Sequence, residues 1–112
     1  MSTAGARAED QALHFLVSQG LELAQRNYRC RMGEIDLILR DGRTVVFVEV
    51  RMRRGRVFGG AAESITNAKQ AKLIATARHY LAGKRPTPPC RFDAVLIEAG
   101  AEPVWIKDAF GE

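Results

Sequence analysis

Two apolar runs separated by a short turn each contain one carboxylate. Asp36 interrupts the run Glu34–Leu39 (EIDLIL), and Glu49 interrupts the run Val45–Val50 (VVFVEV). Runs this apolar are typical of strands that are buried on both faces. A carboxylate inside such a strand is costly unless a cation, several hydrogen bonds or a metal ion pairs with it. Because Mg²⁺ and Mn²⁺ prefer oxygen ligands, two acids in adjacent buried strands make a metal-dependent hydrolase the leading hypothesis.

The size and composition of the chain indicate one ordinary globular domain. Its 112 residues are 46% hydrophobic and 27% charged, which is enough to form a core. No apolar run approaches the roughly 20 residues of a membrane span, and the first ten residues lack the apolar segment of a signal peptide. We therefore expect a single domain over residues 1–112, located in the cytoplasm. Cys30 and Cys90 are far apart in sequence and are expected to be reduced thiols rather than zinc ligands.

The positive charge of the chain is unevenly distributed. The net charge is +4, but the segment Arg26–Arg56 holds nine arginines, no lysine and four acids, for a local net charge of +5. Four of these arginines stand close together: Arg51, Arg53, Arg54 and Arg56. Arginine makes bidentate contacts with phosphate, so this cluster predicts nucleic-acid binding. A solvated basic loop that aids solubility is the alternative.

Periodicity and turn residues predict a mixed α/β domain. The expected helices are Thr3–Gln19, which Gly20 ends, and Ser64–Ala82, which has Ser64 or Thr66 as its N-cap and ends at Gly83. The expected strands are residues 21–27, 34–40, 44–52, 91–98 and 104–107. The connections are a basic turn over 28–33, a hairpin turn at the Asp-Gly pair 41–42, and a mobile loop over 53–62. The sum is a mixed sheet of about five strands with one early and one late helix.

Each predicted helix places a polar residue on its apolar face. In the first helix Leu13, Leu16 and Val17 form the inner stripe, and Glu9 falls on the same side. In the second helix, Gln70 extends a stripe formed by Leu73, Ala77 and Leu81. Glu9 is therefore a third candidate for a buried acid.

Side-chain alternation predicts how these groups meet. Asp36 shares a strand face with Ile38, and Glu49 shares one with Arg51. A short hairpin brings Asp36 and Glu49 close together. Their carboxylates, the backbone carbonyl of Val50 and Glu9 would form an all-oxygen metal site, with Arg51 holding a phosphate.

Simpler explanations exist for each of these residues. Asp36 and Glu49 can form buried salt bridges with Arg51 or Arg91. Glu9 can cap or bridge to a strand backbone, Gln70 can be a satisfied core amide, and Lys69 can be an ordinary surface charge. His14 and His79 fall on polar helix faces and are expected to be inert.

The order of the acidic residues resembles that of the restriction-endonuclease-like nucleases, in which an Asp precedes Glu-X-Lys on the next strand. Here the pattern is Asp36 followed by Glu49-Val50-Arg51. The chain is more closely similar to the YraN family, a bacterial group related in fold to Holliday junction resolvases. The matching stretches are GEIDLI (33–38), VFVEVR (46–51), FGGAA (58–62), KQAKL (69–73), RFDAV (91–95) and WIKDAF (105–110).

This resemblance implies a restriction-endonuclease-like core and a Mg²⁺ or Mn²⁺ site at Asp36 and Glu49, with Glu9 as an accessory acid. It also implies that Lys69 and Gln70 lie near the site, and it suggests a homodimer by analogy with resolvases. Arg51 departs from the Lys of the wider pattern. Because arginine does not lose its proton, the role of Arg51 shrinks to positioning phosphate and stabilising charge. Water activation would then rest on the metal, the substrate phosphate or a group such as Lys69.

The predicted function is a metal-dependent nuclease acting on DNA, including branched or structured DNA. A non-enzymatic nucleic-acid-binding module on a nuclease-like scaffold is the alternative, supported by Arg51. A protein-interaction domain whose buried acids are only structural is the third hypothesis.

Overall fold

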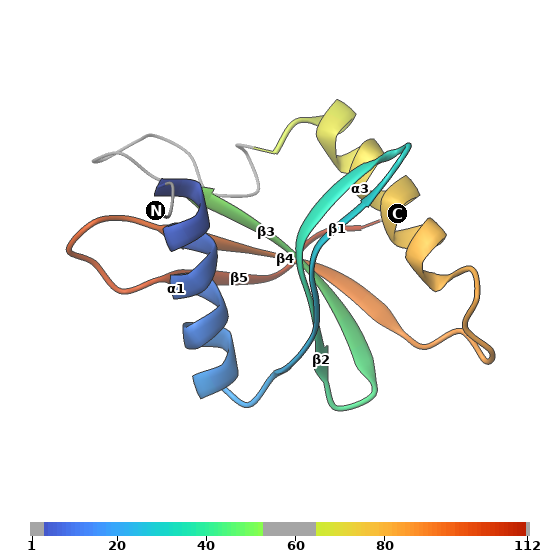
Figure 1. Ribbon diagram of the computed structural model, residues 1–112, viewed down its shortest axis with the longest axis horizontal. Coiled ribbons are helices and arrows are strands. Elements are labelled where there is room, and N and C mark those ends of the chain that lie inside the picture. Colours follow the sequence, from blue (N-terminus) through green and yellow to red (C-terminus); the bar gives the residue numbers. More distant parts are fainter. Residues whose placement is uncertain (1–3, 53–64, 112) are drawn as a thin grey trace.

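The computed structural model describes residues 4–52 and 65–111, which form three layers. Helix α1 (Ala4–Ser18) covers one face of a five-stranded sheet and helix α3 (Asn67–Leu81) covers the other (Figure 1). The strands are β1 (Glu22–Cys30), β2 (Gly33–Asp41), β3 (Thr44–Met52), β4 (Cys90–Ile97) and β5 (Val104–Phe110). The predicted α/β fold is confirmed. None of the helices in these residues is long and apolar enough to cross a membrane.

The strands lie side by side in chain order, from β1 to β5. All neighbours are antiparallel except β3 and β4, which are parallel. Parallel strands need a crossover connection, and α3 belongs to this one. The sheet is therefore mixed, with α3 carried onto one face between its third and fourth strands.

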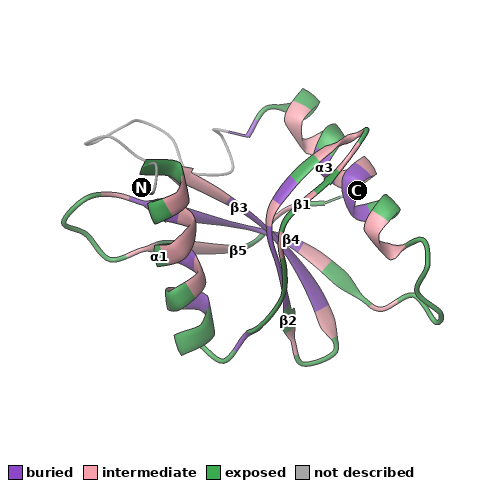
Figure 2. Ribbon diagram, viewed as in Figure 1, coloured by how far each residue is buried: buried purple, intermediate pink, exposed green. Residues whose placement is uncertain are grey.

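Strand alternation supplies a separate core to each face of the sheet, so the middle of the central strands is buried (Figure 2). Helix α1 contributes Ala8, Ala12 and Leu16, which are spaced four residues apart. The predicted stripe was partly wrong, because Val17 is 49% exposed. The buried stripe runs at four-residue intervals from Ala8 to Leu16, and Val17 lies nine residues from Ala8, on the opposite side of the helix.

The helix ends follow their capping chemistry. The side chain of Thr66 accepts a hydrogen bond from the Lys69 backbone N–H at 3.1 Å, so α3 begins at Asn67 rather than at Ser64. Gly20, with φ near +100°, follows the end of α1.

Two strands extend further than predicted, because aromatic contacts hold them. Tyr28 makes an edge-to-face contact with Tyr80 at 5.2 Å, and β1 continues to Cys30, so the predicted turn over 28–33 shrinks to residues 31–32. Phe110 stacks on Phe92 at 4.9 Å, and β5 continues to Phe110. The hairpin between β2 and β3 turns on residues 42–43. The predicted mobile loop 53–62 lies outside the described residues.

Asp93 is a fully buried acid that the sequence analysis missed. Its carboxylate accepts hydrogen bonds from the Arg91 guanidinium at 3.0 and 3.1 Å, from the Trp105 indole at 2.9 Å and from the Asp108 backbone at 2.9 Å. Asp108 has φ near +52°, at an irregularity in the pairing of β4 with β5. The Asp93 carboxylate therefore accepts the Asp108 backbone N–H, which the irregular β4–β5 pairing leaves without a strand partner.

Replacing Asp93 with alanine should destabilise the fold by roughly 3–5 kcal/mol, because the Trp105 indole N–H, the Asp108 backbone N–H and the Arg91 Nε–H lose their buried acceptor. Urea denaturation measures this loss. Asp41→Ala is the matched control, since Asp41 is the second carboxylate of Arg91 and its side chain is 43% exposed. A loss at Asp93 no larger than that of the control would show that the network does not stabilise the protein.

Candidate active site

The site forms where β2 separates from β3. The pairing of these strands runs from Asp41 opposite Thr44 to Leu37 opposite Val48 and then stops. The next pair in this register would place Asp36 opposite Glu49. Instead, the Val50 backbone N–H donates a hydrogen bond to Asp36 Oδ2 at 2.9 Å. A side-chain carboxylate thus replaces the next backbone hydrogen bond between the two strands. We call the place where β2 and β3 diverge, at Asp36 and Glu49, the fork.

The end of the β1–β2 hairpin leaves the sheet at this point and approaches α3 (Figure 1). Asn27 lies opposite Asp36 in the β1–β2 register and has φ near +51°, a left-handed conformation that asparagine tolerates better than most residues. At the tip, a side chain on Gly33 would meet Thr76 Oγ1 at 3.1 Å. A kink in β1 and a close contact at a glycine therefore set the angle of the fork.

A pocket of about 380 Å³ occupies the space between the fork and α3. It is lined by β2, β3 and the first turns of α3 through Gly33, Glu34, Asp36, Glu49, Thr66, Ala68, Lys69, Lys72 and Leu73. Lys69 Nζ lies 3.3 Å from Glu49 Oε2. The structure therefore brings together Asp36, Glu49 and Lys69.

Glu49 has the most perturbed ionisation in the site. Its side chain is only 8% exposed, and burial is the main cause that raises its pKa to about 7. A hydrogen bond with the Asp36 carboxyl and the charge of Asp36 raise this pKa further, whereas the Lys69 ammonium lowers it. Near neutral pH the Glu49 carboxyl therefore holds a proton for much of the time, and a cation bound there would displace it.

Glu9 stands beside this pair. Burial and the charge of Asp36 raise the pKa of Glu9, while Arg26 and a hydrogen bond with Asn27 lower it. Arg26 Nη2 lies 3.9 Å from Glu9 and 2.7 Å from Asp10. Among the described residues the partners of Glu9 are therefore side chains of β1, rather than the strand backbone considered above, and Arg26 offsets part of its charge.

The other predicted residues have different positions. Gln70 Nε2 donates to the Ile65 carbonyl at 2.9 Å and is not among the residues that line the pocket. Arg51 is half-buried near the end of β3 and follows Glu49 on the same strand face. Three of the predicted nucleic-acid contacts, Arg53, Arg54 and Arg56, lie outside the described residues.

One of the simpler interpretations, a salt bridge from Arg91 to the site acids, is wrong. Arg91 pairs with Asp41 and Asp93 rather than with either acid of the site. His79 has a structural partner that the sequence did not show, because its Nδ1 forms a hydrogen bond with the Tyr28 hydroxyl and so links α3 to β1. No sequence signal pairs these residues, which are 51 positions apart.

The oxygen donors at the fork fit a hard divalent ion held by two carboxylates. Across residues 4–52 and 65–111, no three His, Cys, Asp or Glu side chains are grouped to hold a metal. Asp36 and Glu49 would supply the side-chain ligands. The Val50 N–H points toward Asp36, and the N–H and C=O of one strand residue face the same neighbour, so the Val50 carbonyl also faces the fork. Water or phosphate would complete the shell.

The raised pKa of Glu49 should make stability depend on pH. The unfolded carboxyl ionises near pH 4.5, whereas the folded one ionises near pH 7, so the folded state holds more protons between these values. The protonated carboxyl therefore favours folding below pH 4.5, and this contribution is lost as the pH rises to about 7. Relative to the wild type, Glu49→Gln should gain up to about 3 kcal/mol between pH 5 and pH 8 in metal-free urea denaturation. Parallel stability curves for the two proteins would contradict this assignment.

Comparison with known proteins agrees with the order of motifs along the chain. Residues 8–97 match the model of the uncharacterised protein family UPF0102, the YraN family. A UPF0102 protein of Nitrosomonas eutropha is 61% identical over 96% of this chain and 93% of its own length. Similar proteins of Nitrosomonas europaea and Nitrosococcus oceani are 60% and 55% identical, covering 100% and 95% of this chain and 99% and 90% of their own lengths. The chain belongs to family UPF0102.

Proposed function

We propose that this protein is a metal-dependent nuclease that hydrolyses phosphodiester bonds in DNA, with branched or otherwise structured DNA as its substrate. The observation that carries this proposal is the meeting of Asp36, Glu49 and Lys69 at one pocket beside the fork of the sheet. A buried Glu49 with a raised pKa beside the Asp36 carboxylate forms a site that a cation can occupy. A lysine beside them can attract a phosphate.

Each residue has a distinct task in this reaction. Asp36 and Glu49 would hold Mg²⁺ or Mn²⁺, and the bound ion would lower the pKa of a water molecule and neutralise charge on the phosphate. Asp36 accepts the Val50 N–H through Oδ2, so its other oxygen is the one available to a ligand. Arg51 remains protonated and would orient the phosphate at the end of β3.

Lys69 gives the site a lysine that position 51 does not supply. It comes from the first turn of α3, and its side chain is 43% exposed, so the ammonium can reach both Glu49 and a bound phosphate. Lys72 lines the same pocket one turn further along the helix. A helix-borne lysine therefore compensates for Arg51, because it can stabilise the charge that develops on the phosphate.

Substituting Glu49 with alanine should reduce cleavage by at least about 100-fold while leaving DNA binding intact. The assay uses Mn²⁺ and a panel of linear duplex, single strand, flap, four-way junction and RNA. Glu34→Ala is the control, because Glu34 lines the same pocket but pairs with Arg29 at the exposed hairpin tip. Equal cleavage by wild type and Glu49→Ala would refute the proposed role.

Replacing Lys69 with methionine should separate metal binding from turnover. Removal of the ammonium 3.3 Å from Glu49 removes a charge that competes with the metal, so Mn²⁺ should bind several-fold more tightly. Cleavage should nevertheless fall at least tenfold, because the phosphate loses its cation. Titration of Mn²⁺ by electron paramagnetic resonance measures the first effect. Weaker Mn²⁺ binding by the variant would show that Lys69 only maintains the structure.

A specific observation also favours the non-enzymatic nucleic-acid-binding module. Lys69 already gives Glu49 a cationic partner, so the buried acid is partly compensated without a metal. This alternative requires that the wild type bind DNA but cleave no member of the panel with Mn²⁺ or Mg²⁺.

A further inference from the structure

A second basic region lies outside the arginine-rich segment. From Ile65 to Phe92 the chain contains no Asp or Glu and six basic residues: Lys69, Lys72, Arg78, Lys84, Arg85 and Arg91. Arg91 is used internally by Asp41 and Asp93. The remaining five belong to α3 and the segment that follows it.

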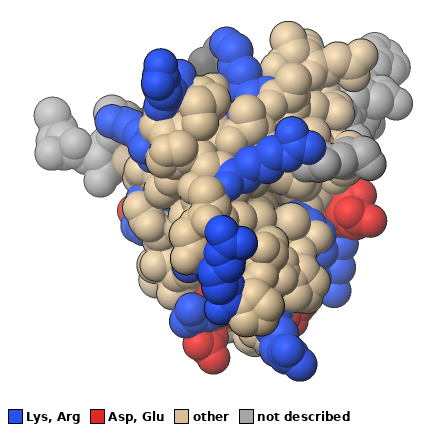
Figure 3. Space-filling view, turned by 90° about the vertical axis from the view of Figure 1, so that its right-hand side faces the viewer, with Lys and Arg blue, Asp and Glu red and all other residues tan. Residues whose placement is uncertain are grey.

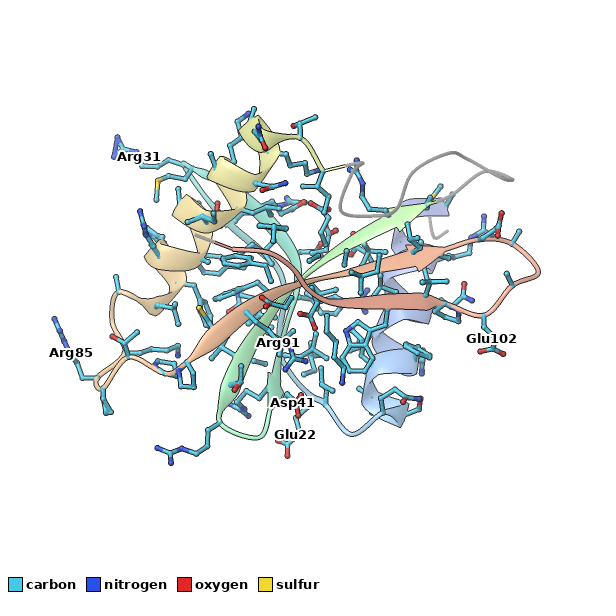
Figure 4. The ribbon with its side chains drawn as sticks, turned by 180° about the vertical axis from the view of Figure 1, so that it is seen from behind. Glu22, Arg31, Asp41, Arg85, Arg91 and Glu102 are labelled. Carbon is cyan, nitrogen blue, oxygen red and sulfur yellow. The ribbon has the colours of Figure 1, made fainter. Side chains whose placement is uncertain are left out.

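The side of the molecule on which α3 lies carries many basic groups (Figure 3). Figure 3 views that side and shows Lys and Arg spread over it, with the acidic groups toward its margins. Arg31 and Arg85 project outward on the side where α3 lies, one from the β1–β2 tip and one beyond the end of the helix (Figure 4). We define the α3 face as Arg31, Lys69, Lys72, Arg78, Lys84 and Arg85.

Little within the described part of the chain neutralises this face. Lys69 pairs with Glu49 inside the pocket, but no carboxylate of residues 4–52 or 65–111 pairs with Lys72, Lys84 or Arg85. Like charges gathered on one side repel each other and oppose folding. A polyanion that covers the face would remove this repulsion and release counterions.

We propose that the α3 face binds the phosphate backbone of a nucleic-acid duplex that extends from the pocket along α3. This inference rests on the proposed function, since it supplies the path of the same substrate. The fifteen residues of α3 span roughly 22 Å, about two-thirds of a duplex turn, so its basic residues can contact phosphates several base pairs from the pocket.

The aromatic residues of this region favour a duplex over a single strand. Tyr28 and Tyr80 pack edge to face, Phe47 packs against Tyr80 at 5.9 Å, and the Lys84 ammonium lies 4.7 Å from the centre of the Tyr80 ring. Single-strand binding relies on open rings that stack on bases. Because these rings are already packed against other side chains, charge remains as the means of recognising nucleic acid. Charged side chains contact the phosphate backbone, and such contacts do not depend on the base sequence.

The test is the salt dependence of binding to a 30-base-pair duplex, measured by fluorescence anisotropy without divalent metal. The double variant Lys84→Glu/Arg85→Glu lies beyond the pocket and outside the candidate active site. It should bind at least tenfold more weakly, and the slope of log K against log salt should fall by about 2. The control, Arg7→Glu/Lys107→Glu, has the same change in charge on α1 and on β5, where Lys107 lies over Trp105. It should remain within about twofold of the wild type.

Three outcomes would overturn the inference. They are equal losses in the two double variants, tighter binding to a 30-nucleotide single strand than to the duplex, and stronger binding to anionic lipid vesicles than to the duplex at the same salt. Melting temperatures of both double variants guard against misfolding, and Lys84→Gln/Arg85→Gln should give an intermediate loss. Failure of the nuclease proposal remains distinguishable, because an inactive protein would still bind the duplex through the α3 face.

Discussion

One hydrogen bond, from the Val50 N–H to Asp36 Oδ2, organises the site. It ends the β2–β3 ladder without leaving a backbone donor unpaired, so β2 can separate from β3 while both remain in the sheet. The separation creates room between the sheet and α3. The acid at the fork therefore satisfies the backbone with one oxygen and presents the other to the pocket.

The electrostatics of the pocket follow from that geometry. Glu49 lies in the sheet next to a fork that admits a second carboxylate, and burial makes two charges there unfavourable. Lys69 reaches in from α3 and offsets part of this cost. The site is thus a compromise in which a proton, an ammonium group and a divalent ion would compete for the same oxygens, and polarity that would weaken an ordinary core becomes a means of binding a cation.

The sequence predicted the features that local patterns encode. The limits of β3 and the approach of Asp36 to Glu49 followed from alternation and a short hairpin. The Asp93 network could not be predicted, because Trp105 and Asp108 lie 12 and 15 residues away on a strand whose pairing is irregular. The length of β1 depends on the contact of Tyr28 with Tyr80. The inner face of α1 depends on which of its small and large apolar residues pack on the sheet, and these are Ala8, Ala12 and Leu16. These are tertiary effects that override local signals.

Asp36 both accepts a backbone N–H and lines the pocket, and this has a consequence for which substitutions the family can tolerate. A residue at 36 must accept the Val50 N–H if the fork is to persist, so asparagine could replace it without loss of architecture. Glu49 has no comparable bond to the backbone among the contacts described, since its partners are the side chains of Lys69 and Asp36. In a lineage that abandons the chemistry, drift should therefore begin at position 49, while position 36 stays polar for structural reasons. Under the proposed function, an acid at 49 is therefore the better marker of a metal site than an acid at 36.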